Sequence, residues 1–145
     1  MASVIREIIV EAPPEKVWDV VGDFANGPPR FAPGMLVDCR VDEAGVRTIT
    51  FADGTAARER LIARDEQARR IVWAWVADEV VHDNTSMQVF AQGEAQSRLV
   101  WIHDTLPDEL TGWLATAMDR LAPVFQRTFN NGDEPGSLGS EEQVG

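Results

Sequence analysis

The stretch SRLVWIHDTLPDELTGWLATAMDRLAPVFQRTF, residues 97–129, decides the fold. Its first residues alternate, so that Leu99 and Trp101 share one face, and this pattern predicts a strand. Residues 107–129 carry apolar side chains at steps of three and four, which predicts a long helix with one apolar face. At about 1.5 Å per residue this helix reaches about 30 Å, enough to cover one side of a sheet. Pro123 lacks a backbone N–H and is expected to kink or divide the helix.

The segments before this pair read as a series of strands separated by short turns. Runs rich in β-branched and aromatic residues are bounded by Gly, Pro, Asp and Asn. A short helix over residues 15–21 follows the Pro13-Pro14 pair, and residues 27–34 are bent by Pro and Gly. Most connections are short enough to join antiparallel neighbours, so a meander is the economical topology. The expected strands are residues 3–11, 35–41, 46–52, 55–63, 70–77, 84–92 and 97–105.

Length and charge limit the domain count and the possible partners. The chain has 145 residues, which fits one domain, and we expect that domain to span residues 1–129. Lys plus Arg number 13 and Asp plus Glu 24, so the net charge of −11 has the wrong sign for binding nucleic acid. Residues 130–145 are rich in Gly and acidic residues, and we expect them to form a disordered acidic tail.

The cysteine content and the short apolar runs indicate a cytoplasmic protein. Cys39 is the only cysteine, so no internal disulfide can form, which suits a reducing compartment. The longest unbroken apolar run is residues 71–77, far shorter than the roughly 20 residues of a membrane helix. We therefore expect no integral membrane segment, and either a monomer or a homodimer.

A second stretch points to a family. Residues 8–24, IIVEAPPEKVWDVVGDF, are followed by Glu59-Arg60-Leu61, Trp73 and the run SRLVW at 97–101. In this order they resemble the bacterial polyketide cyclase/dehydrase-like branch of the START/SRPBCC superfamily, over residues 3–129. The resemblance implies an α+β helix-grip fold. In that fold a curved antiparallel seven-stranded sheet wraps around a long C-terminal helix, and two short helices lie between the first two strands.

The resemblance also implies a function. It indicates a hydrophobic small-molecule ligand in an internal cavity, handled by a cofactor-independent polyketide cyclase/dehydratase-like or isomerase-like enzyme of secondary metabolism. The alternative is a non-catalytic carrier or sensor of a lipid-like ligand, and an interaction module with a filled interior also stays open. The sequence has no nucleophile elbow, phosphate loop or dinucleotide fingerprint, and its two His lie far apart. We therefore expect no cofactor and no metal site.

Aromatic side chains are the main candidates for lining the cavity. Trp73 and Trp75 share one strand face, and the resemblance places that face inward. They either fill the core or form an aromatic wall for a planar ligand. The other apolar residues expected to contact a ligand are Phe51, Trp101, Trp113 and Met118.

Glu59 is the first candidate catalytic residue, because the resemblance places it on the inward face of its strand. A buried carboxylate must be paired, hydrogen-bonded or protonated. Arg47 on the preceding strand is the nearest partner. A structural ion pair therefore competes with roles of the two side chains as a polar anchor and a general base for a ligand. A regular two-residue turn at Asp53-Gly54 would set them on opposite faces, so the ion pair requires a bulge or a longer loop.

His103 is the second candidate catalytic residue. Imidazole ordinarily changes its charge near neutral pH, which suits a proton shuttle. Leu99, Trp101 and His103 alternate with Val100 and Ile102, and both faces carry apolar residues. The sequence therefore leaves open which face of this strand points inward.

The strand over residues 84–92 poses the same question. Asn84, Ser86 and Gln88 share a face and are candidate ligand contacts, and the family resemblance favours this face as the inward one. If Met87 and Val89 face inward instead, the three polar side chains are merely solvated.

Overall fold

Seven antiparallel strands form one sheet within residues 2–130, the part of the chain that the computed structural model describes. The strands are β1 (Ala2–Val10), β2 (Leu36–Val41), β3 (Val46–Phe51), β4 (Ala56–Asp65), β5 (Arg70–Val76), β6 (His82–Ala91) and β7 (Ser97–Leu106). The helices are α1 (Pro14–Val21), α2 (Gly27–Phe31) and α3 (Leu110–Asn130). The sheet order β1-β7-β6-β5-β4-β3-β2 confirms the meander, with β1 added beside β7. The tail over residues 130–145, expected to be disordered, lies outside the described residues except for Asn130.

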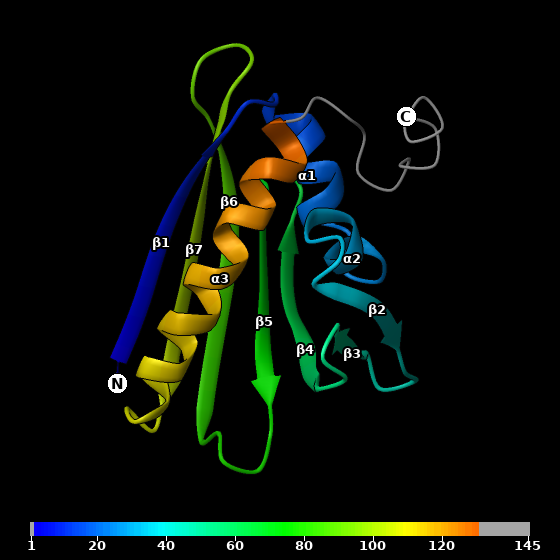
Figure 1. Ribbon diagram of the computed structural model, residues 1–145, viewed down its shortest axis with the longest axis vertical. Coiled ribbons are helices and arrows are strands. Elements are labelled where there is room, and N and C mark those ends of the chain that lie inside the picture. The colour runs from blue at the N-terminus through cyan, green and yellow to red at the C-terminus, as the bar shows by residue number, and fades with distance from the viewer. Residues whose placement is uncertain (1, 131–145) are drawn as a thin grey trace.

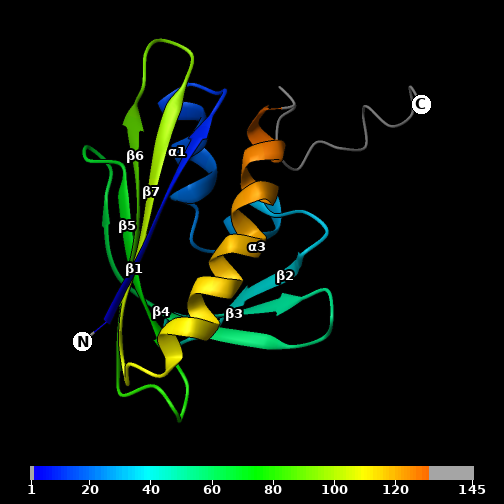
Figure 2. The same cartoon turned by 60° about the vertical axis from the view of Figure 1, so that its left-hand side comes forward.

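The sheet is strongly curved, and α3 lies on its concave side (Figure 1). Figure 2 shows β1, β6 and β7 on one side of this helix and β2 and β3 on the other. α3 packs mainly against β1 and also contacts β7 and α2. At the β1 contact, Arg6 Nε donates to Asp119 Oδ1 at 2.6 Å, and Arg6 Nη2 donates to Oδ2 at 3.1 Å. The arrangement confirms the helix-grip fold predicted from the sequence.

The apolar faces of the helices meet the concave face of the sheet and form the core. Phe125 of α3 packs edge-to-face on Phe31 of α2, with ring centroids 4.6 Å apart, and its centroid lies 5.3 Å from that of Trp101 on β7. In α1, which begins at Pro14, Trp18 is buried with its Val neighbours. None of the helices within residues 2–130 is both long and apolar enough to cross a membrane.

The division expected at Pro123 does not occur, since α3 runs from Leu110 to Asn130 as one helix. Pro123 is an exposed residue of α3, and so is Asp119, whose carbonyl loses its backbone donor. Phe125 is almost completely buried two residues later and holds the helix on the sheet. The missing backbone hydrogen bond therefore falls where the helix tolerates it.

The β3–β4 hairpin differs from the two-residue turn that the sequence suggests. Its loop is longer, because Phe51 N–H donates to Thr55 O at 2.8 Å and Gly54 N–H donates to Phe51 O at 2.9 Å. Gly54 has a φ of 91°, which glycine adopts without steric cost. The extra loop residue sets Arg47 directly opposite Glu59, on the same face of the sheet.

Candidate functional site

Cross-strand pairing places most of the candidate side chains in rows on the concave face. One row crosses β5, β6 and β7 through Trp73, Thr85 and His103. The neighbouring row begins with Arg47, Glu59 and Trp75, which pair in sequence across β3, β4 and β5. On β7 the alternation left open by the sequence is now settled, because the inward side chains are the buried ones. These are Ser97, Leu99, Trp101, His103 and Thr105.

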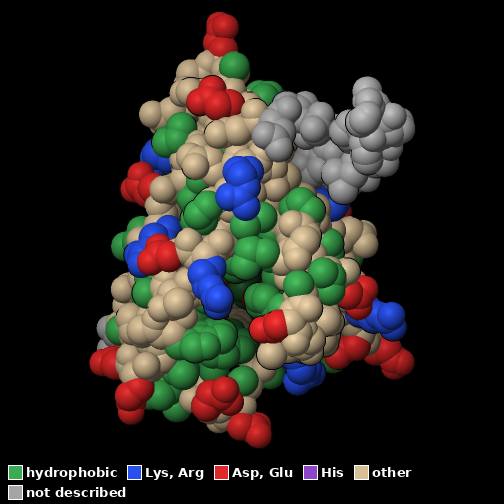
Figure 3. Space-filling model, viewed as in Figure 1, with side chains coloured by type: hydrophobic (Ala, Val, Ile, Leu, Met, Phe, Trp, Pro, Cys, Tyr) green, Lys and Arg blue, Asp and Glu red, His purple; other side chains and the backbone are tan. Residues whose placement is uncertain are grey.

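A groove runs along this face, because α3 covers the β1–β7 side and leaves the side of β3 to β5 partly open. Leu61 shares the concave face with Trp73 but is 37% exposed, and Trp113 in the first turn of α3 is 59% exposed. Trp113 stacks on the half-buried Trp75, with ring centroids 5.3 Å apart. Figure 3 shows hydrophobic side chains gathered around a hollow beside α3. The concave groove is lined by Phe51, Glu59, Leu61, Trp73, Trp75 and Trp113.

A buried polar cluster lies at the β6–β7 side of the groove, centred on Asp83. Asp83 Oδ2 accepts from the Trp75 backbone N–H at 2.9 Å and from the Thr85 hydroxyl at 2.8 Å. Asp83 Oδ1 accepts from the Thr105 hydroxyl at 2.6 Å and lies 3.2 Å from His103 Nδ1. Thr85 Oγ1 is 2.7 Å from the same Nδ1. The Asp83 cluster comprises Asp83, Thr85, His103 and Thr105.

The hydrogen bonds of the Asp83 cluster assign the proton on the His103 ring. Thr85 donates its hydroxyl proton to Asp83, so its oxygen accepts from His103, and Asp83 Oδ1 is also an acceptor. Nδ1 is therefore the nitrogen that carries the proton in the neutral ring, and Nε2 carries the lone pair. Nε2 lies on the side of the ring turned away from Asp83, and no hydrogen bond within residues 2–130 involves it.

The cluster also keeps Asp83 ionised. Burial opposes the charged form, but the hydrogen bonds from His103 and Thr105, the charge of the imidazole and the Trp75 N–H outweigh it and lower the pKa of Asp83. A buried carboxylate that accepts from Nδ1 holds an imidazole in one tautomer and stabilises the imidazolium that forms when Nε2 takes a proton. This arrangement can support general acid–base chemistry at Nε2.

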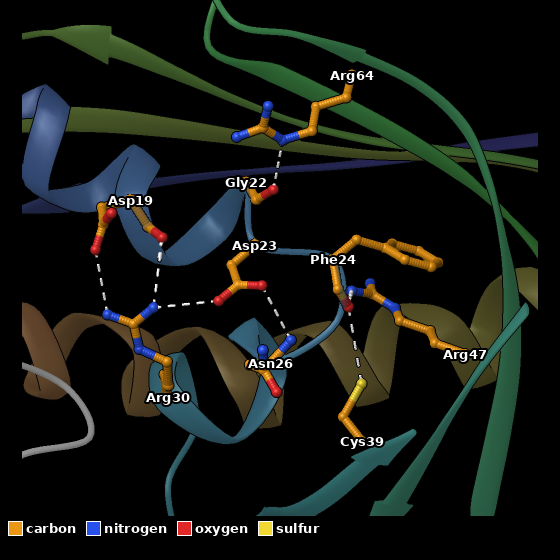
Figure 4. Close-up of polar contacts among 9 residues, drawn as sticks. All are labelled: Asp19, Gly22, Asp23, Phe24, Asn26, Arg30, Cys39, Arg47 and Arg64. Carbon is orange, nitrogen blue, oxygen red and sulfur yellow. Dashed lines mark hydrogen bonds and ion pairs between the residues drawn. The ribbon is translucent and has the colours of Figure 1, made fainter. Parts of the chain in front are cut away.

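Arg47 and Glu59 form the ion pair that the sequence left as one of two possibilities. Arg47 is only 2% exposed, and its Nε and Nη2 lie 2.8 Å and 2.7 Å from Glu59 Oε1. The guanidinium carbon lies 4.3 Å from the ring centroid of Phe24 and 4.8 Å from that of Trp73. Arg47 Nη1 donates to the Phe24 carbonyl at 3.0 Å (Figure 4). The pair therefore holds the segment between α1 and α2 against the groove.

A separate cleft of about 700 Å³ lies outside the groove, between α1, the segment after it and the β4–β5 turn. Several of its charged side chains contact one another or the backbone. Arg30 pairs with Asp19 and Asp23, and Arg64 donates to the Gly22 carbonyl at 2.7 Å (Figure 4). The cleft shares no residue with the Asp83 cluster. We therefore place the candidate site in the concave groove, where the acid–base groups lie.

The prediction that the polar residues of β6 face inward is wrong. Thr85 pairs with His103 on the concave face, and Met87 on the same face is buried. Because side chains alternate along a strand, the residues between them lie on the convex face. Gln88 instead donates to the Ala68 carbonyl at 3.2 Å and supports the β4–β5 turn. The three residues concerned are Asn84, Ser86 and Gln88.

Sequence reasoning missed three members of the Asp83 cluster. Asp83, Thr85 and Thr105 were not singled out, although a signal for two of them existed. Met87 and Val89 are apolar and share a strand face with Asp83 and Thr85. Reading that apolar pair as the core side of the strand would have placed both polar residues inside.

The other predicted contacts divide between the core and the groove. Trp101 and Met118 are buried, and Trp101 packs on Phe125 of α3. Phe51, on the concave face of β3, is half-buried at the hairpin end of the groove. Trp75 and Trp113 form the stacked pair at its opening.

Comparisons with known proteins agree with this architecture. Residues 1–131 match the family described as "Polyketide cyclase / dehydrase and lipid transport". Among curated proteins, none matches the sequence. A START superfamily protein from Mycobacterium smegmatis has a TM-score of 0.71 at 14% identity, over 90% of this chain and 99% of that one. The Zhui aromatase/cyclase from a Streptomyces species has a TM-score of 0.69 at 19% identity, over 90% of this chain and 92% of that one.

A plant enzyme shares the fold at greater distance. Norcoclaurine synthase from Thalictrum flavum, solved with dopamine and hydroxybenzaldehyde, has a TM-score of 0.58 at 18% identity, over 85% of each chain. At such identities these structures establish the fold, and the match over residues 1–131 establishes the family. The START-like architecture and the family match agree, and the chain therefore belongs to the polyketide cyclase/dehydrase and lipid transport family.

Proposed function

We propose that the protein binds an apolar small molecule in the concave groove and that His103 moves a proton on it, without a cofactor. The observation that carries the proposal is the pairing of buried Asp83 with His103 Nδ1, which leaves Nε2 as a base on an apolar face. The reaction class is cyclisation, dehydration or isomerisation next to a carbonyl. Aromatase/cyclase activity in a Streptomyces protein of the same fold supports this class.

The proposed chemistry follows from the tautomer of His103. Nε2 removes a proton from a carbon next to a carbonyl, and the electron pair moves to the carbonyl oxygen as an enolate. The enolate carbon attacks a second carbonyl carbon of the same molecule, and a C–C bond forms. The resulting alkoxide takes the proton back from Nε2–H, so the protein returns to its starting state. Asp83 stabilises the imidazolium between the two proton transfers.

Glu59 is a poorer base than His103 in this proposal. Its Oε1 accepts two contacts from Arg47. β4 and β7 are three strand spacings apart, so the backbones at Glu59 and His103 are separated by about 14 Å. The two residues therefore do not serve the same proton, and Glu59 positions Arg47 and the wall of the groove.

The experiment measures base catalysis with nitrobenzisoxazole, a flat aromatic probe. When a base removes its ring C–H proton, the N–O bond breaks and a coloured cyanonitrophenolate is released. We expect the wild type to accelerate this reaction. The rate increase caused by His103→Gln is expected to be about 100-fold smaller than that caused by the wild type. Glu59→Gln is expected to keep most of the rate. Equal rates for wild type and His103→Gln would overturn the catalytic proposal.

A carrier function is the second candidate, favoured by the apolar, partly open groove and by the lipid-transport part of the family description. Tryptophan fluorescence separates the two candidates, because Trp73, Trp75 and Trp113 lie along the groove. Stoichiometric quenching by aminoanthracene, combined with no His103-dependent turnover of the probe, favours the carrier. His103-dependent turnover favours the enzyme.

A further inference from the structure

β2 forms one edge of the sheet, and no strand within residues 2–130 pairs with its outer side (Figure 1). Val37 and Val41 of this strand are 53% and 42% exposed. The opposite edge, on β1, is contacted by α3, whose Gln126 donates to the Ile9 carbonyl at 2.9 Å. A strand edge with free N–H and C=O groups is a template for pairing with another chain.

The backbone of β2 determines which groups are free to pair. The Asp42 N–H donates to the Val46 carbonyl at 2.9 Å and closes the turn between β2 and β3. Successive residues of a strand direct their N–H and C=O groups to opposite sides, so the even-numbered residues of β2 bond to β3. Cys39 and Val41 therefore direct these groups to the outer side. A register shift before residue 38 limits this regular stretch to residues 38–41.

Two opposite charges lie on either side of Cys39. Asp38 and Arg40 share one face of β2, their side chains reach solvent, and Arg40 Nε donates to Asp38 Oδ2 at 3.0 Å. An antiparallel pairing of two copies of β2 about Cys39 sets Asp38 opposite the partner's Arg40. By symmetry, Arg40 lies opposite the partner's Asp38. The same pairing brings Val37 opposite the partner's Val41, so the strand is complementary to itself in both charge and hydrophobicity.

Hydrogen bonding and charge together specify the register of this pairing. A shift by one residue would set outward-directed groups opposite residues whose groups already bond to β3, so the new hydrogen bonds could not form. A shift by two residues would set Asp38 opposite the partner's Asp38, or Arg40 opposite the partner's Arg40. Like charges directly opposite each other destabilise a sheet. The pairing centred on Cys39 satisfies both conditions.

We propose that two copies of the chain pair through β2, about a two-fold axis at Cys39, and join their sheets into one continuous sheet. A second copy fits this edge because one set of residues supplies both halves of the contact. Of the monomer and the homodimer that the sequence leaves open, the edge selects the homodimer. The regular stretch is short, so the dimer is weak and depends on concentration. The pairing needs no ligand, and its failure would leave the groove function standing.

The first test is sedimentation velocity with charge-reversal variants. We expect the wild type to change from monomer to dimer as its concentration rises from about 5 to about 500 µM. Asp38→Arg and Arg40→Asp each set like charges opposite each other, and each is expected to weaken the dimer at least about tenfold. A 1:1 mixture of these two variants restores opposite charges at both positions and is expected to dimerise. Glu94→Arg, in the exposed β6–β7 turn, changes the net charge as much as Asp38→Arg and is expected to dimerise like the wild type.

The second test is amide hydrogen exchange of the wild type at the lowest and highest concentrations. The N–H groups of Cys39 and Val41 are expected to exchange at least about tenfold more slowly at the higher concentration. The Arg40 N–H is the internal control, because it bonds to β3 within one copy and is expected to change little. A wild type that stays monomeric, a mixture no more dimeric than its components, or a dimer without protection at Cys39 would each overturn the proposal.

Discussion

Replacing Asp83 with Asn is expected to destabilise the protein strongly, although it changes only one atom in a buried side chain. Each carboxylate oxygen of Asp83 receives two donors, so the new amide NH2 turns one acceptor into a donor that faces two other donors. A lost hydrogen bond to a charged group or a buried unpaired donor costs about 1–3 kcal/mol. Removal of a desolvated charge offsets part of this loss. We expect a net loss of about 3 kcal/mol, a large share of the 5–15 kcal/mol that is typical of a domain.

The assay is urea unfolding followed by tryptophan fluorescence between pH 6 and pH 3. The folded-state pKa of Asp83 is lowered, so its ionisation adds stability above the unfolded-state pKa of about 3.9. That contribution is lost as the pH falls through the lower folded-state pKa. The difference in unfolding free energy between wild type and Asp83→Asn is therefore expected to be full at pH 6 and to shrink towards pH 3.

Asp78→Asn is the matched control, because Asp78 is an exposed carboxylate five residues earlier in the chain. It is expected to change the unfolding free energy by less than about 0.5 kcal/mol. If Asp83→Asn lowers the unfolding free energy no more than this control does, the buried hydrogen bonds of Asp83 do not stabilise the fold. If the difference in unfolding free energy between wild type and Asp83→Asn stays constant from pH 6 to pH 3, the charge of Asp83 is not the cause of that difference.

Three further perturbations test other parts of the structure by chemical denaturation and thiol chemistry. Arg47→Met is expected to lower the unfolding free energy by about 3–5 kcal/mol, because it leaves the half-buried Glu59 carboxylate without its partner. Adding Glu59→Met is expected to recover part of this loss, and a double variant less stable than Arg47→Met would contradict the explanation. Gly27→Ala is expected to destabilise by about 1–3 kcal/mol, because its Cβ would overlap the Val20 carbonyl oxygen. A Cβ at Gly112 meets no atom within 4 Å, so Gly112→Ala is expected to stabilise α3 by about 0.5–1 kcal/mol. If both variants changed the unfolding free energy in the same direction, the close contact between Gly27 and Val20 would not explain the result. Burial raises the pKa of the Cys39 thiol. A disulfide reagent at pH 7 is therefore expected to react with Cys39 at least tenfold more slowly in the folded chain than in urea. Equal reaction rates would show that the folded chain presents an accessible thiolate.

The spacing of apolar residues predicted most of the strands and helices, because burying one face of an element imposes that spacing directly on the sequence. The alternation in residues 97–105 and the three-and-four spacing after residue 107 predicted β7 and α3. The division of the helix at Pro123 could not be judged from the sequence, because the side of the helix on which Pro123 lies depends on how α3 packs on the sheet. The two-residue turn at Asp53-Gly54 was wrong because one added loop residue changes which side chains share a face.

The candidate site was harder to predict than the fold. His103 and the Trp residues stand out by type, but the choice of face depends on pairing between strands far apart in sequence. Asp83 became visible only through its partners on β5 and β7, which lie 8 and 20 residues away. Buried polar clusters are specified by such long-range register, which no local pattern in one strand reveals.

A pair of variants on β4 shows whether the concave groove binds a small apolar molecule. Leu61 faces the groove and is 37% exposed, whereas Arg60 is exposed on the opposite face of the same strand. Leu61→Trp fills the groove, and Arg60→Trp adds the same ring outside it.

The measurement is aminoanthracene affinity by fluorescence titration of the wild type and both variants, each shown to be folded by its unfolding transition. We expect aminoanthracene to bind the wild type and Arg60→Trp with similar affinity, and to bind Leu61→Trp at least about tenfold more weakly. Equal affinity in the two variants, or loss only in Arg60→Trp, would contradict this expectation.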